Sequence, residues 1–69
     1  MKRDKARDDK FFNCFSKHEV NYVAGLYSLR ENVKKFLEEK SKDGTIKYMT
    51  HRSLYELIEK ELGYPMPNN

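Results

Sequence analysis

Hydrophobic residues recur at the spacing of an α-helix in three separate stretches of the chain. This periodicity predicts a first helix over residues 17–27, a second over 29–42, and a third between Thr50 and Gly63. The apolar stripes are Val20, Val23, Ala24 and Tyr27 in the first, Leu29, Val33, Phe36 and Leu37 in the second, and Leu54, Leu57, Ile58 and Leu62 in the third. The pattern is typical of a mainly α fold, a compact three-helix bundle.

Signals for helix starts and ends flank these stretches. Ser16 and Ser28 each stand three residues before a Glu, which is the spacing of a capping box, so a helix is expected to begin after each Ser. Thr50 is an acceptable N-cap for the third helix. Gly44 and Gly63 are expected to supply the left-handed residues that end the second and third helices.

Two short stretches outside the helices resemble extended chain. Residues 45–49 alternate between polar and apolar, and residues 11–15 contain three phenylalanines. Because a lone strand is unstable, pairing of 11–15 with 45–49 in a two-stranded ribbon is the arrangement that would stabilise both.

Sixty-nine residues allow one domain. Dense mixed charge predicts a disordered tail over residues 1–10, a single helical domain over 11–64, and a second tail over 65–69. Of the net charge of +3, the first ten residues hold five basic and three acidic side chains, so the remainder of the chain is nearly neutral. That balance weakens an assignment to nucleic acid binding on charge alone.

Few residues could carry catalysis. The single cysteine, Cys14, excludes an internal disulfide, and with His18 and His51 it falls short of a structural zinc site. The carboxylate pairs lie on the faces of the helices that are expected to be exposed to solvent, and the sequence has no phosphate-binding Gly loop. We therefore expect no enzymatic activity, catalytic residue, metal, cofactor or small-molecule substrate. No apolar run is long enough for a membrane span and no signal-peptide pattern occurs, so we expect a cytoplasmic protein.

Residues 23–33 resemble the helix-turn-helix family, with Ala24, a small turn residue four positions on, and an apolar residue in the second helix. Ser28 replaces the usual Gly of that turn. The resemblance implies that the second helix enters the major groove with Ser28, Arg30, Lys34 and Lys35 near bases or phosphates. Glutamates on the same helix oppose that contact. Nucleic acid binding, assisted by the basic N-terminal tail, is thus the second hypothesis.

The run from Thr50 to Tyr64 is similar to the closing helix of small bacterial helical proteins of unknown function. This resemblance rests on residues 50–64 and implies a helical fold without any particular activity.

Aromatic residues provide the leading functional hypothesis. The chain has nine of them, more large apolar groups than so small a domain can bury. Tyrosine and phenylalanine are enriched at protein interfaces. We therefore predict binding of a protein partner, or of a second copy, through a surface made of Phe11, Phe12, Phe15, Tyr48 and Tyr55.

Overall fold

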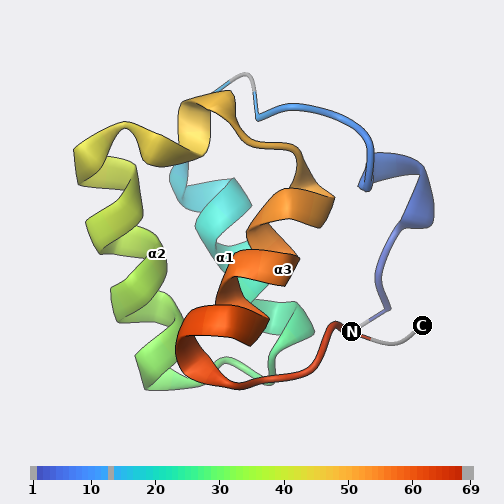
Figure 1. Ribbon diagram of the computed structural model, residues 1–69, viewed down its shortest axis with the longest axis vertical. Helices are drawn as coiled ribbons and strands as arrows, with labels where there is room; N and C mark the ends of the chain where they lie inside the picture. The colour runs from blue at the N-terminus through green and yellow to red at the C-terminus, as the bar shows by residue number, and fades with distance from the viewer. Residues whose placement is uncertain (1, 13, 68–69) are drawn as a thin grey trace.

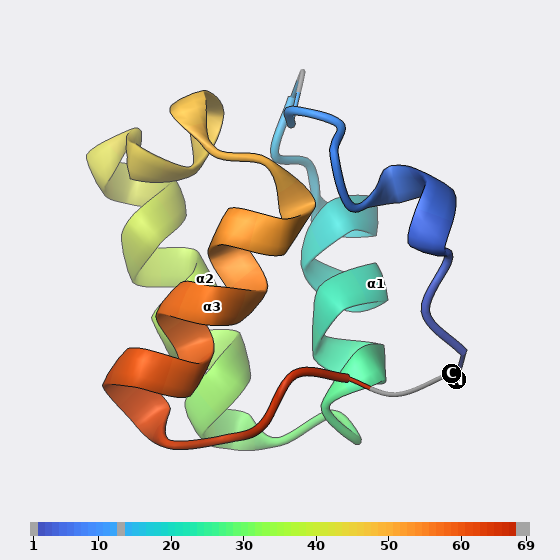
Figure 2. The same ribbon diagram turned by 45° about the vertical axis from the view of Figure 1, so that its right-hand side comes forward.

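The computed structural model describes residues 2–12 and 14–67 and contains three α-helices, α1 (Lys17–Leu26), α2 (Glu31–Asp43) and α3 (His51–Leu62). Two short 3-10 helices, η1 (Lys5–Arg7) and η2 (Thr45–Tyr48), precede α1 and α3 respectively. The α-helices pack around one core, and the N-terminal segment runs along the outside of the bundle (Figures 1 and 2). The predicted mainly α three-helix bundle is confirmed.

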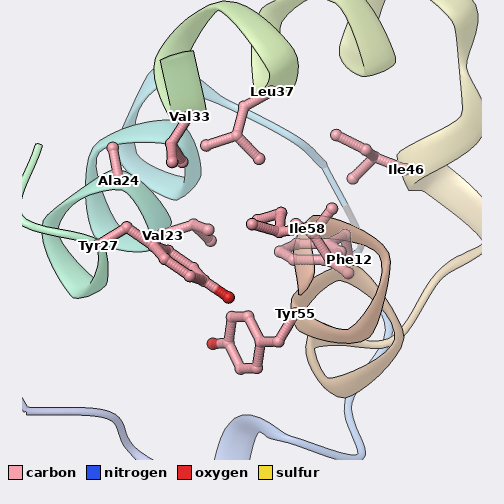
Figure 3. Packing of buried hydrophobic residues seen from close by; sticks show 10 residues of the cluster. Phe12, Val23, Ala24, Tyr27, Val33, Leu37, Ile46, Tyr55 and Ile58 are labelled. Atoms are coloured by element: carbon pink, nitrogen blue, oxygen red, sulfur yellow. The ribbon is translucent and has the colours of Figure 1, made fainter. Parts of the chain in front are cut away.

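The core is formed by one face of each α-helix together with side chains from the connecting segments (Figure 3). Its buried members are Phe12, Val23, Ala24, Tyr27, Val33, Leu37, Ile46, Leu54, Tyr55 and Ile58. Most of the stripe residues predicted from the helical periodicity are therefore buried. Burial of a large apolar side chain contributes roughly 1.5–3 kcal/mol, so these faces determine how the helices pack.

The turn between α1 and α2 shows that the predicted helix start at Ser28 is wrong. The N–H of Leu29 donates to the carbonyl of Ala24 at 2.8 Å, a bond that closes a helix C-terminus. Ser28 and Leu29 both adopt left-handed backbone, with φ of 61° and 54°. Ser28 therefore takes part in ending α1, and α2 begins only at Glu31.

The other helix ends follow their sequence signals more closely. Ser16 occupies the N-cap of α1, although its side chain makes no capping hydrogen bond. The Thr50 hydroxyl accepts from the N–H of Ser53 at 3.1 Å, as expected for the N-cap of α3. Gly44 and Gly63 have φ of 76° and 77° and end α2 and α3 in the predicted left-handed conformation.

In the described part of the chain, the predicted ribbon of residues 11–15 with 45–49 is reduced to one isolated antiparallel bridge, between Phe11 and Thr50. Residues Thr45–Tyr48 form η2 instead. This turn satisfies its own backbone, since the N–H of Met49 donates to the carbonyl of Ile46 at 3.0 Å. It also buries the Ile46 side chain, and an isolated two-stranded ribbon is at best marginally stable in water.

The N-terminal segment, predicted to be a disordered tail, packs against the bundle over its described residues. The carbonyl of Asp8 accepts from the N–H of Arg52 at 2.9 Å, and the carbonyl of Lys10 accepts from the N–H of His51 at 3.1 Å. The first N–H groups of a helix have no partner within it. Backbone atoms from the start of the chain therefore cap α3.

Ion pairs also join the N-terminal segment to α3, and a hydrogen bond links the two ends of the chain. The buried Asp8 carboxylate lies 3.5 Å from Arg3 and 3.8 Å from Arg52. Arg3 also donates to the carbonyl of Pro67 at 2.7 Å, and Pro67 is itself buried. Pro67, in the predicted C-terminal tail, is thus held against the N-terminal segment.

Candidate functional site

The structure divides the predicted aromatic surface between core and solvent. Phe12 and Tyr55 are 3% and 0% exposed, so both are core residues and cannot form a surface. Phe11 and Tyr48 are 61% and 82% exposed. Phe15 is half-buried beside the core. The predicted surface is therefore reduced to Phe11, Phe15 and Tyr48.

A short antiparallel pairing explains why Phe11 is exposed while its neighbour Phe12 is buried. Phe11 pairs with Thr50 in an isolated bridge, and the N–H of Phe12 donates to the carbonyl of Met49 at 3.2 Å. Successive side chains of extended backbone point to opposite sides. Phe12 consequently enters the core, where its ring stacks 3.9 Å from that of His51, and Phe11 faces outward.

The exposed rings occupy one end of the bundle. The bridge brings Phe11 beside the segment that follows η2, whose last residue is Tyr48. Phe15 precedes α1, and its ring meets that of Phe12 edge-on at 5.0 Å. This end lies at the top of Figure 1, opposite the turn that joins α1 to α2.

The residues predicted to contact nucleic acid lie in the turn before α2 and along the first part of that helix. Ser28 lies in the left-handed turn, outside α2. The guanidinium of Arg30 stacks 4.9 Å from the ring centre of Tyr64, so a cation–π contact with the C-terminal segment engages it. Lys34 is half-buried, whereas its neighbour Lys35 is exposed.

A groove lies beside Phe15. It consists of two hollows, of about 440 Å³ between α1 and α2 and about 450 Å³ beside η2. Phe15 and Ser41 line both, so the hollows adjoin each other. We call the pair of hollows the Phe15 groove. Its lining includes four lysines, Lys17, Lys34, Lys42 and Lys47.

A third hollow, of about 330 Å³, lies next to His51 and the exposed Cys14. The Nδ1 of His51 lies 2.9 Å from the carbonyl of Lys10, and its Nε2 lies 3.4 Å from the Glu19 carboxylate. Glu19 also pairs with Arg7 at 3.7 Å. These contacts tie the N-terminal segment to α1 and α3, which supports a structural role for His51.

Among residues 2–12 and 14–67, no group of three or more His, Cys, Asp or Glu side chains is arranged to hold a metal ion. The same residues include no helix with the length and apolar character needed to cross a bilayer.

The helix-turn-helix resemblance singles out Lys34 but none of the other lysines of the Phe15 groove. Lys17 begins α1, Lys42 lies in the last turn of α2, and Lys47 belongs to η2. No spacing rule links three such elements, so only the folded chain brings these lysines together.

Comparison with known proteins found no match to a protein-family model, to a curated protein or to a solved structure.

Proposed function

We propose that this chain is a non-enzymatic protein-binding domain that uses the exposed rings of Phe11 and Tyr48, with Phe15 beside them, to bind a protein partner or a second copy of itself. The observation that supports the proposal is the exposure of Phe11 and Tyr48 on neighbouring segments at one end of the bundle. Aromatic side chains bury large areas at little entropic cost and are enriched at interfaces.

Sedimentation velocity from micromolar to millimolar concentration tests self-association. The double variant Phe11→Ala/Tyr48→Ala should lose any association of the wild-type chain while its thermal unfolding changes little, because both side chains are exposed. Leu29→Ala is the matched control. Leu29 is also a large exposed apolar residue, but it lies in the turn at the opposite end of the bundle.

Photo-crosslinking tests binding of a different protein. The photoreactive residue benzoylphenylalanine replaces Tyr48 in one variant and Leu29 in the control. A partner that binds through Phe11 and Tyr48 should crosslink at position 48 and not at position 29. A chain that stays monomeric and crosslinks equally at both positions would refute the proposal.

A further inference from the structure

We infer that the Phe15 groove binds an acidic peptide segment that places an apolar side chain against Phe15 and carboxylates beside the surrounding lysines. This inference rests on the proposed protein-binding function and specifies the chemistry of the partner.

The shape and lining of the groove suit a peptide side chain. Phe15 is common to both hollows, while Val20 lines one of them and Ile46 the other. Each hollow is within the size range of small ligand pockets, roughly 300–1,000 Å³. An amphipathic peptide commonly binds by placing its apolar residues in a hydrophobic groove between helices.

The charge of the groove favours an acidic partner. Lys17, Lys34, Lys42 and Lys47 contribute four positive charges, and Glu38 is the one carboxylate among the lining residues. Across the described residues, none of these four lysines forms a salt bridge. The arginines Arg3, Arg7 and Arg52, in contrast, are engaged with carboxylates of the N-terminal segment or α1. Unpaired lysines at a groove attract and orient an oppositely charged partner.

The same lining is less suited to a nucleic acid. Proteins that bind single strands combine a basic groove with several aromatic rings on which successive bases stack. Phe15 is the single aromatic side chain among the lining residues, and it is packed edge-on against Phe12.

A second copy of the chain offers a competing acidic surface. Glu56 and Glu59 are exposed on one face of α3, away from the groove between α1 and α2. Contact of that face with the groove of another copy would join molecules head to tail. A partner peptide requires no such open-ended assembly, so we take it as the occupant, and the experiment distinguishes the two.

Fluorescence anisotropy with a labelled synthetic peptide tests the inference. The probe is an amphipathic peptide with leucines on one helical face and glutamates beside them. A second peptide replaces the leucines with serine at unchanged charge. The wild-type chain should bind the first peptide, and the serine peptide should bind at least about tenfold more weakly, because burial of one apolar side chain is worth over 1.4 kcal/mol.

Two neighbouring lysines of α2 provide the matched protein variants. Lys34 lines the groove, whereas Lys35 is exposed outside it, and Lys34→Glu and Lys35→Glu change the net charge equally. We expect Lys34→Glu to weaken binding about tenfold and Lys35→Glu to leave it within about twofold. Circular dichroism verifies that both variants remain folded. Equal loss in the two variants would overturn the inference, because it would indicate attraction by net charge alone.

Three further outcomes would each either overturn or support the inference. Tighter binding of a single-stranded oligothymidylate than of the acidic peptide would overturn the inference in favour of nucleic acid. Self-association that Lys34→Glu abolishes, without peptide binding, would make a second copy the occupant. Peptide binding that is lost in Lys34→Glu but unchanged in Phe11→Ala/Tyr48→Ala would support the groove. The sedimentation and crosslinking results would then decide separately whether Phe11 and Tyr48 carry the proposed function.

Discussion

Replacement of Asp8 by Asn tests whether the N-terminal segment is integral to the fold. The Asp8 side chain is 4% exposed and lies 3.5 Å from Arg3, whose side chain is 13% exposed. At an effective dielectric constant of about 20, that separation corresponds to a gross attraction of roughly 4–5 kcal/mol. Desolvation offsets much of it in the native protein. Removal of the carboxylate, however, leaves Arg3 buried without its counterion, and such losses are about 3–5 kcal/mol.

We expect Asp8→Asn to lower the free energy of unfolding by about 3 kcal/mol, since the amide can keep part of the contact. For a domain of this size, that loss corresponds to a fall in melting temperature of about 12–24 °C. Urea denaturation followed by circular dichroism measures the change. Because total stability is expected to be only about 3–10 kcal/mol, sucrose can be added equally to all samples if the variant is marginal.

Asp9→Asn is the matched control for this experiment. Asp9 also faces Arg52, at 3.7 Å, but its side chain is 88% exposed. An exposed pair contributes about 0–1 kcal/mol, so the control should change stability very little. Molar salt should weaken any effect at Asp9 more than the effect at Asp8. Equal losses in the two variants would refute the argument from burial.

The remaining predictions concern the core and the turns. Burial raises the pKa of Tyr27 to about 12, and its hydroxyl is buried without a hydrogen-bond partner among the described residues. An unfolded phenol ionises near pH 10, so the contribution of Tyr27 to stability should be constant below that pH and should fall between about pH 10 and 12, by up to about 1.4 kcal/mol per pH unit. Tyr27→Phe should reduce that slope in urea titrations at several alkaline pH values, and an unchanged slope would contradict the assignment. Leu29→Gly should raise stability by about 0.5–1 kcal/mol by relieving a left-handed conformation, whereas Gly44→Ala should lower it by about 1 kcal/mol without any steric clash. Thermal melts that show the opposite signs would refute this reasoning.

Local signals predicted the helices well where they acted alone. Thr50, Gly44 and Gly63 define helix ends through their own side chains or their tolerance of left-handed backbone, and the structure places them as expected. The helix start predicted at Ser28 was wrong because a Ser followed three residues later by a Glu is also compatible with the end of the preceding helix. The hydrogen bond from the N–H of Leu29 to the carbonyl of Ala24 shows that the end of α1 prevails here.

The surface was harder to predict because exposure depends on contacts distant in sequence. Phe11 and Phe12 are chemically identical neighbours, and only the pairing with Met49 and Thr50 sends one ring outward and the other inward. Tyr55 lies on the edge of the stripe of α3, and it is buried because Tyr27 and the N-terminal segment cover it (Figure 3).

The capping of α3 by residues 8–10 has a consequence for local unfolding. The amide protons of His51 and Arg52 are bound to carbonyls some forty positions earlier in the chain. They can exchange with solvent only when the N-terminal segment lifts away, so their protection reports the opening free energy of that segment. The start of α3 and the start of the chain thus form one cooperative unit. A partner that pulled the first residues from the bundle would loosen the third helix in the same event.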